Sequence, residues 1–246
     1  MKNDLAYYDR QAAHWWEPDA KIRALEQLNP PRFEFFDRYI TDWSNLKVLD
    51  VGCGGGYSCE FLAQRGAKVW GIDRSEPCIQ VARDRVRTQG LPIEYQTGTA
   101  EALPYPDNSF DAITCLDVLE HVASPQQTIA EIARILKPGG WFCFDTVNRT
   151  RLSYFVMIFL LETLTGLIPR GIHDWQKFIR PRELQQWLGD RGLTTMAIAG
   201  FNPFGRPFID YLPALWHYLR TQQLRVRIDH NTSVMYVGVA QKHCDR

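Results

Sequence analysis

Residues 47–57 read KVLDVGCGGGY, a strand-like run that ends in a glycine-rich turn. Glycine lets the backbone turn sharply and leaves room for a ligand against the main chain, because it has no side chain. In open α/β sheets, ligands bind beside the carboxyl ends of the strands. The next strand-like run ends at Asp73, about 20 residues later, where a carboxylate can accept hydrogen bonds from both ribose hydroxyls. Together these features predict a nucleotide-type ligand.

Strand-like and helix-like segments alternate on both sides of this turn. Apolar, β-branched runs at 47–51, 68–73, 93–97, 110–115 and 141–147 are interleaved with amphipathic stretches at 57–65, 77–89 and 126–136. Such alternation predicts βαβ units and a parallel sheet with helices on both faces. The third helix should stop before the next strand at Leu136-Lys137-Pro138-Gly139-Gly140, because proline and glycine end helices.

The whole chain, residues 1–246, is expected to form one doubly wound, Rossmann-like α/β domain. Its sheet should have seven mostly parallel strands and an antiparallel last strand. Beyond Asn148 we expect an apolar insert, a helix over 181–191, and strands near 194–199 and 234–241 that pair antiparallel at the sheet edge. The predicted parts are an N-terminal helical cap (1–44), a cofactor-binding core (45–148), an apolar lid or insert (149–192) and C-terminal strands (193–246).

Amino-acid composition limits which binding partners and which cell compartment we expect for this protein. Lysine plus arginine equals aspartate plus glutamate at 28 each, so no net field attracts nucleic acid, which we do not expect as a partner. The six cysteines form no CxxC pair, which argues against a disulfide framework or zinc site and favours the reducing cytoplasm. The N-terminus resembles no secretion signal. The longest apolar run, 152–161, is about half of the ~20 residues that a membrane-spanning helix needs.

Two kinds of ligand fit a glycine turn of this type: S-adenosylmethionine (SAM) and a nicotinamide or flavin dinucleotide. The dinucleotide fingerprint needs a small residue three positions after its second glycine, and counting from Gly54 reaches Tyr57. That bulky side chain would obstruct the close helix–strand approach of a pyrophosphate site, whereas SAM carries no phosphate. We therefore favour SAM, with Gly52 and Gly54 against it and Asp50 near its cationic end. A dinucleotide-dependent oxidoreductase and a donor-binding module without turnover remain alternatives.

The segment Gly98-Thr99-Ala100-Glu101-Ala102-Leu103-Pro104, with the strand at 110–113, resembles the adenine-contacting region of class I SAM-dependent methyltransferases. By that resemblance Ala100 and Glu101 border the adenine, and Leu116 lines the donor pocket. Without it, these would be ordinary loop and core residues.

Further segments resemble the O-methyltransferases of ubiquinone biosynthesis, which act on polyprenyl catechols. The matching stretches are Trp15-Trp16-Glu17-Pro18, Leu28-Asn29-Pro30-Pro31-Arg32, 50–56, Leu119-Glu120-His121-Val122, Lys137-Pro138-Gly139-Gly140, Asn148-Arg149 and 169–179. The resemblance implies that Arg32, Gly52, Asp73 and Leu116 contact the donor, and we add the neighbouring Arg74 to that group. It also implies an acceptor hydroxyl on a polyprenyl phenol or catechol. Residues 201–230 have no clear counterpart, so O- or C-methylation of another small lipophilic molecule is the alternative.

Asp117, Glu120 and His121 follow the fourth strand, and offsets of three and four residues place them on one face of a helical turn. The resembling family includes members that bind a divalent metal through Glu-x-x-Glu-His, which implies a Mg²⁺ site with the shorter Asp117 in first position. A metal bound by both catechol oxygens would stabilise the phenolate. Alternatively, His121 acts as general base beside Glu120. A third reading is that Glu120 and His121 only brace the following helix.

The insert at 152–161 is apolar almost all round, so it must be buried, cover an apolar substrate or lie on a membrane. Basic residues follow it at Arg170, Lys177, Arg180 and Arg182. A polyprenyl substrate would require access to lipid, and basic side chains favour an anionic lipid surface. We therefore expect a substrate lid with peripheral membrane contact, with a plain core helix as the alternative.

Overall fold

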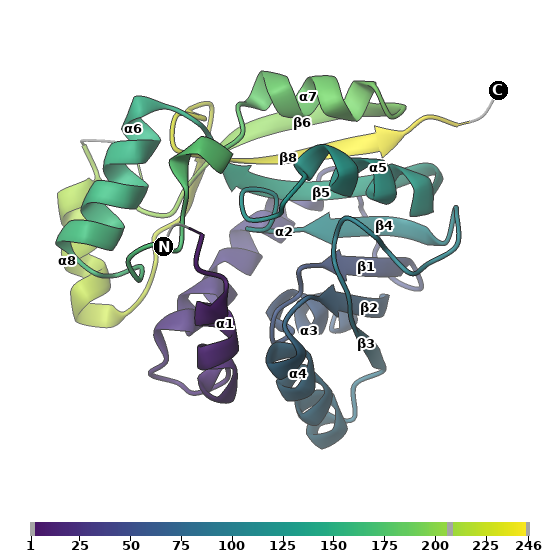
Figure 1. The fold of residues 1–246 in the computed structure, drawn as a ribbon, viewed down its shortest axis with the longest axis horizontal. Coiled ribbons are helices and arrows are strands. Elements are labelled where there is room, and N and C mark those ends of the chain that lie inside the picture. The colour runs from purple at the N-terminus through teal and green to yellow at the C-terminus, as the bar shows by residue number, and fades with distance from the viewer. Residues whose placement is uncertain (1–2, 206–208, 245–246) are drawn as a thin grey trace.

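The computed structural model describes residues 3–205 and 209–244, and its centre is an eight-stranded sheet (Figure 1). The strand order across the sheet is β3-β2-β1-β4-β5-β8-β6-β7. Neighbours from β3 to β5 are parallel, and the pairs β5–β8, β8–β6 and β6–β7 are antiparallel. The strands are β1 (Lys47–Val51), β2 (Lys68–Asp73), β3 (Ile93–Thr97), β4 (Phe110–Cys115), β5 (Leu136–Val147), β6 (Leu193–Asn202), β7 (Arg227–Asp229) and β8 (Met235–Lys242).

Helices cover both faces of the sheet. One apolar core joins the sheet to α2 (Asn29–Phe36), α3 (Tyr57–Ala63) and α4 (Glu76–Gln89). A second core joins the opposite face to α5 (Pro125–Ile135) and α7 (Pro181–Gly189), which lie together over that face in Figure 1. Strand β1 is buried along almost its whole length because neighbours flank it and helices cover it.

The remaining helices gather at the end of the sheet where the parallel strands finish (Figure 1). Before α2 the chain forms α1 (Ala6–Gln11) and two 3-10 segments, η1 (Ala12–His14) and η2 (Lys21–Leu28). After β5, the short α6 (Arg151–Ser153) continues into the π-helix η3 (Tyr154–Leu164), and the 3-10 turn η4 (Trp175–Lys177) follows. Helix α8 (Tyr211–Thr221) lies beside this insert at the same end. Segments from three distant parts of the chain therefore cover the carboxyl ends of the parallel strands.

The predicted fold class is confirmed, with two corrections at the second half of the sheet. The predicted count of seven strands is wrong: β7 adds an eighth, and its three residues are too few to show a strand-like alternation. The last two predicted strands do pair antiparallel, through contacts such as Ala199 with Val237. However, β8 lies between β5 and β6, so the edge of the sheet is formed by β7.

The Pro138-Gly139-Gly140 stop also differs from its prediction. Helix α5, the third helix predicted from the sequence, ends at Ile135, close to its expected end, but β5 begins immediately at Leu136. Its register against β4 shifts between Phe110 and Ala112, which pair with Leu136 and Trp141. The proline and glycines thus form an irregularity inside a long strand rather than a loop before it.

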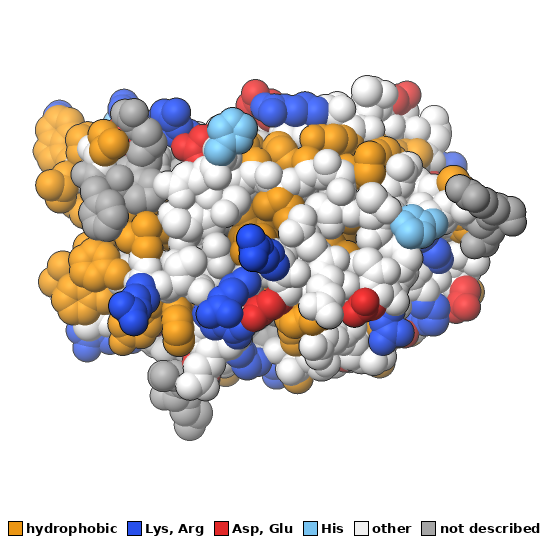
Figure 2. All heavy atoms as spheres, turned by 90° about the horizontal axis from the view of Figure 1, so that it is seen from above, with side chains coloured by type: hydrophobic (Ala, Val, Ile, Leu, Met, Phe, Trp, Pro, Cys, Tyr) orange, Lys and Arg blue, Asp and Glu red, His pale blue; other side chains and the backbone are white. Residues whose placement is uncertain are grey.

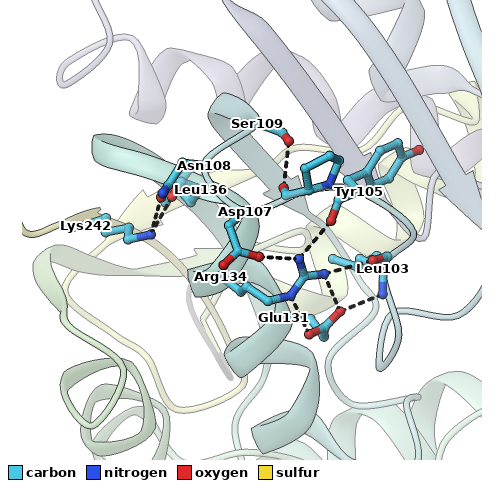
Figure 3. Close-up of polar contacts among 10 residues, drawn as sticks. Leu103, Tyr105, Asp107, Asn108, Ser109, Glu131, Arg134, Leu136 and Lys242 are labelled. Carbon is cyan, nitrogen blue, oxygen red and sulfur yellow. Dashed lines mark hydrogen bonds and ion pairs between the residues drawn. The ribbon is translucent and has the colours of Figure 1, made fainter.

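Arg134 of α5 fastens the segment that leads from β3 to β4 (Figure 3). Its guanidinium donates to the carbonyl oxygens of Leu103 and Tyr105 at 2.9 and 2.8 Å, and to the Asp107 carboxylate at 2.8 Å. Glu131 binds the same guanidinium and accepts from the Leu103 N–H at 2.9 Å. Arg134 and Glu131 together therefore satisfy three main-chain groups of a segment without regular structure.

We predict that Arg134→Ala lowers the free energy of unfolding by about 2 kcal/mol, because hydrogen bonds to charged groups contribute more than neutral ones. Urea denaturation followed by circular dichroism measures the change. Arg87→Ala is the matched control, since the Arg87–Asp84 pair is exposed, at 71% and 57%, and its loss should change stability by less than about 0.5 kcal/mol. Equal effects of the two substitutions would contradict this role of Arg134.

Candidate functional site

A cavity of about 620 Å³ opens at the carboxyl ends of β1, β2 and β4, and we name it the glycine-loop cavity. All residues that the sequence analysis assigned to the donor line it: Arg32, Asp50, Gly52, Gly54, Asp73, Arg74, Ala100, Glu101 and Leu116. Asp117 and His121 line it as well. Segments from α2 to the end of β4 thus meet around one space.

The glycine turn forms one wall of this cavity and has no room for side chains. Gly52 has φ +75°, and a Cβ there would lie 2.3 Å from the Val118 side chain. At Gly54 a Cβ would lie 2.6 Å from the Trp15 ring. The Gly52 N–H donates to the Ile72 carbonyl oxygen at 2.7 Å, which ties the turn to β2. Backbone atoms therefore face the cavity directly.

Two aspartates follow β1 and β2 in different surroundings. Asp73 accepts hydrogen bonds from the backbone N–H of Gly54 at 2.9 Å and of Ser75 at 2.8 Å, so it joins the two strand ends. Asp50 is buried and accepts from the Thr114 hydroxyl at 2.7 Å. Burial raises the pKa of Asp50 to about 6 and also raises the pKa of Asp73. A bound positive charge would favour the ionised form of both carboxylates.

Arg32 lies at the floor of the cavity between two carboxylates. It is 2% exposed, and its guanidinium pairs with Asp145 of β5 through Nε and with Asp117 through Nη2. The Asp117 N–H donates to Asp145 at 2.7 Å, which closes the cluster. Burial alone would lower the pKa of Arg32, but the two carboxylates outweigh it and raise that pKa. Burial raises the pKa of Asp145 despite the pairing.

A second cavity, of about 160 Å³, adjoins the first, and we name it the apolar cavity. The side chains of Tyr8, Leu25, Asp117 and His121 line both cavities, so they mark the junction between them. The rest of its lining is mainly apolar and comes from η2, the insert, α8 and β8, including Ile22, Leu28, Val156, Met157, Leu161, Tyr211, Tyr218 and Met235. The two cavities thus combine a polar, main-chain-lined space with an apolar one.

Asp117, Glu120 and His121 all line the apolar cavity, but they are not arranged as the expected metal site. Within residues 3–205 and 209–244, no three His, Cys, Asp or Glu side chains are grouped so that they could hold a metal ion. Asp117 is turned to Arg32, and Glu120 accepts from the Thr146 hydroxyl at 2.8 Å. Asp117 has φ +55°, so the expected helical turn does not start there. Each carboxylate therefore has a partner other than a metal.

His121 lies at the junction of the cavities with one ring nitrogen occupied. Its Nδ1 is 2.9 Å from the Asn3 side-chain oxygen, and its ring stacks on His173 at 5.2 Å between centroids. Burial lowers the pKa of His121 well below its ordinary value, and His173 and Lys177 lower it further. The imidazole is therefore neutral near pH 7. If Nδ1–H donates to Asn3, the lone pair on Nε2 is available to accept a proton.

Glu120 lines the apolar cavity but not the glycine-loop cavity. Burial raises its pKa, and the charge of Asp117 adds to that rise.

Glu101 has a structural contact in addition to its place in the cavity wall. Its carboxylate accepts from the N–H groups of Ala123 at 2.8 Å and Ser124 at 3.4 Å, which fastens the start of α5.

Sequence analysis missed the aromatic cover of the glycine turn. Trp15 is 4% exposed and lies over Gly54, while the Tyr57 hydroxyl donates to the Trp15 carbonyl oxygen. The Tyr57 ring also packs on Trp16 at 4.6 Å. Among the described residues the buried indole N–H of Trp15 has no hydrogen-bond partner. Trp15 was noted only as part of a family match, because nothing local in the sequence places it opposite a turn some 40 residues later.

Comparison with known proteins agrees with this arrangement. Residues 49–144 match the model of a family described as a methyltransferase domain. Ubiquinone biosynthesis O-methyltransferases from Stutzerimonas stutzeri (39% identical, 95% of this chain and 96% of that protein) and Coxiella burnetii strain RSA 331 (40%, 88% and 96%) are similar over most of their length. The relative from Alkalilimnicola ehrlichii is 39% identical over 84% of this chain and 85% of its own.

Solved structures agree on the fold. Magnesium protoporphyrin IX methyltransferase from Synechocystis PCC 6803 with bound SAH superposes with a TM-score of 0.65 at 19% identity, covering 98% of this chain and 95% of that one. A SAM-dependent methyltransferase from Aquifex aeolicus gives 0.61 at 17% identity, with 95% and 97% covered. Sequence identity near 40% along almost the whole chain is much stronger than this likeness of fold. The chain is therefore a SAM-dependent methyltransferase and belongs to the ubiquinone biosynthesis O-methyltransferase family.

Proposed function

We propose that this enzyme transfers the methyl group of SAM to a hydroxyl of a polyprenyl phenol or catechol on the ubiquinone pathway. The observation that carries the proposal is the junction of the two cavities at Asp117 and His121. A polar nucleoside and an apolar acceptor can approach each other there from opposite sides. The similar proteins are named as O-methyltransferases of ubiquinone biosynthesis, which supports an acceptor hydroxyl on that pathway.

The donor is assigned to the glycine-loop cavity. Asp73 keeps free lone pairs for the ribose hydroxyls, and Ala100 and Glu101 lie where the adenine would end, with Arg74 at the wall. Gly52, Gly54 and Leu116 would border the methionine part, whose carboxylate would pair with Arg32. Asp50 supplies negative charge toward the sulfonium and ammonium groups. When bound, SAM supplies the electrophilic methyl carbon.

The acceptor is assigned to the apolar cavity, with its reacting hydroxyl at the junction. A phenol with a pKa of about 10 must lose its proton before its oxygen attacks the methyl carbon in line with the departing sulfur. His121 is neutral and offers Nε2 as the proton acceptor, and Glu120 can hold a hydrogen bond to the acceptor oxygen. No step here passes through a divalent metal, because Asp117 and Glu120 are turned to Arg32 and Thr146.

We also propose that the end of the molecule formed by the insert and α8 contacts a membrane peripherally. Apolar side chains are exposed there, and Figure 2 shows them gathered at this end with basic side chains among them. This surface, named the apolar end patch, comprises Tyr154, Phe155, Phe159, Leu164, Leu212, Trp216 and Leu219, each 45–79% exposed. Among the described residues no helix is long and apolar enough to cross a bilayer. Exposed aromatic and aliphatic groups beside arginines favour an anionic lipid surface.

The acceptor assignment is tested by incubating the purified enzyme with labelled SAM and a panel of acceptors. We expect transfer to a demethylated polyprenyl catechol and little to phenols without a prenyl tail, because the apolar cavity would bury the part of the tail nearest the ring. Product is measured by extraction and mass spectrometry. Transfer only to unrelated phenols, or to carbon, would reject the acceptor class. Donor binding with no transfer to any acceptor would indicate a module without turnover.

The role of His121 is tested with His121→Gln. We expect kcat to fall about 10²- to 10⁴-fold while the dissociation constant for SAM changes little, because the base is lost and the donor contacts remain. Since burial lowers the pKa of His121, the acid limb of the wild-type kcat profile should lie below pH 6.5. His14→Gln, at an exposed position, is the control. A variant with wild-type kcat at all pH values would remove His121 from the proton transfer.

Membrane contact is tested by sedimenting the protein with vesicles of phosphatidylglycerol or of phosphatidylcholine. We expect preferential binding to the anionic vesicles and at least about tenfold weaker binding of the double variant Leu212→Ser/Trp216→Ser, because two apolar side chains leave the interface. Met196→Ser is the control, since Met196 is 47% exposed on β6 outside the patch. Equal losses in both variants, or none in either, would argue against the apolar end patch.

A further inference from the structure

Asp117 lies at the junction of the two cavities with its side chain held against Arg32. It follows Leu116 at the end of β4 and has φ +55°, in the left-handed region that non-glycine residues rarely occupy. Its N–H donates to Asp145 at 2.7 Å, and its carboxylate pairs with Arg32 Nη2. The chain thus holds this carboxylate against the arginine at the floor of the donor site.

The two carboxylate partners of Arg32 differ in their surroundings. The Asp145 side chain is fully buried within β5, whereas that of Asp117 is 20% exposed on a loop. Asp117 also lines both cavities, and Asp145 lines neither. Asp117 is therefore the partner that can leave Arg32 without opening the core.

The donor carries a group of the same chemistry as Asp117. An α-amino acid carboxylate can form the same charge-assisted hydrogen bonds with a guanidinium. Exchanging one carboxylate for another keeps the buried guanidinium of Arg32 paired, and an unpaired buried arginine would be the costly outcome. Arg32 and Asp117 both line the glycine-loop cavity, so an incoming carboxylate meets their ion pair directly.

We infer that Asp117 occupies the position on Arg32 that the donor carboxylate takes, and that Asp117 leaves Arg32 when the donor binds. This inference rests on the proposed placement of the donor carboxylate on Arg32. The donor carboxylate takes Arg32 Nη2, and the side chain of Asp117 turns toward the junction beside His121 and Glu120. There it accepts a hydrogen bond from the catechol hydroxyl that is not methylated, which positions the neighbouring reacting hydroxyl to give its proton to His121. The acceptor site is therefore completed only after the donor has bound.

Titration calorimetry with two nucleosides tests the exchange. S-Adenosylhomocysteine has the amino acid carboxylate, and 5′-methylthioadenosine lacks the whole amino acid part. Asp117→Asn removes the competing charge, so it should bind S-adenosylhomocysteine about tenfold more tightly than wild type, a change of about 1.4 kcal/mol. Its affinity for 5′-methylthioadenosine should be unchanged. Asp84→Asn, which removes an exposed carboxylate from α4, should change neither affinity.

Weaker binding of S-adenosylhomocysteine by Asp117→Asn would overturn the inference, because Asp117 would then hold the donor ammonium instead. Equal shifts for both nucleosides would also overturn it, since they would indicate a general change of the cavity. Failure of every protein, wild type included, to bind S-adenosylhomocysteine would instead reject the proposed donor site. The two failures are therefore distinguishable.

A second measurement uses wild type and does not depend on the folding of the variant. The affinity for a short-chain prenyl catechol is measured by fluorescence with and without saturating S-adenosylhomocysteine. We expect the bound nucleoside to tighten catechol binding at least about fivefold in wild type and not in Asp117→Asn. Wild-type affinities that are equal with and without the nucleoside would overturn the inference, as would the same gain in the variant.

Discussion

The pairing of buried Arg32 with the carboxylates of Asp117 and Asp145 is the interaction on which this structure depends most. It joins α2 to the ends of β4 and β5, across 85 and 113 positions of the sequence. A guanidinium taken out of water is very costly unless it is paired. The N-terminal segment is therefore fixed to the strand ends at the point where the two cavities meet.

Because α2 is held at the strand ends, the N-terminal segment before α2 is held near the glycine turn as well. Upstream of Arg32 the chain places Trp15 against the glycine turn, where its ring fills the volume that side chains at Gly54 and Gly55 would need. The absence of side chains in the turn thus serves two contacts, with the ligand on one side and with the indole on the other. Tyr57, which argued against a dinucleotide by its size, anchors this cover through the Trp15 carbonyl oxygen.

Local patterns in the sequence predicted the parts of the fold that local physics determines. Alternating β-branched and amphipathic segments identified β1 to β5 and their helices, and the glycine turn with Asp73 identified one wall of the cavity. Sequence spacing brought Asp117, Glu120 and His121 to one cavity, but it did not predict their partners, because the left-handed backbone at Asp117 keeps that residue out of the helical turn. His121 contacts Asn3, 118 positions away, and no periodicity encodes such a pair. β7 was missed because three residues carry no pattern.

Residues 201–205 and 209–230 belong to the segment for which the sequence motifs indicated no clear counterpart, and they border both the apolar cavity and the solvent. Phe204, Tyr211, Tyr218 and Leu224 line the apolar cavity, while Leu212, Trp216 and Leu219 of the same segment are exposed on the apolar end patch. Two different faces of α8 thus lie toward the cavity and toward the solvent. A cavity of about 160 Å³ is too small to enclose a long polyprenyl chain, so under the proposed function a long tail would leave it past α8 and the insert. Changes of sequence in α8 would then alter the exit for the tail without touching the glycine turn or the ion pair at Arg32.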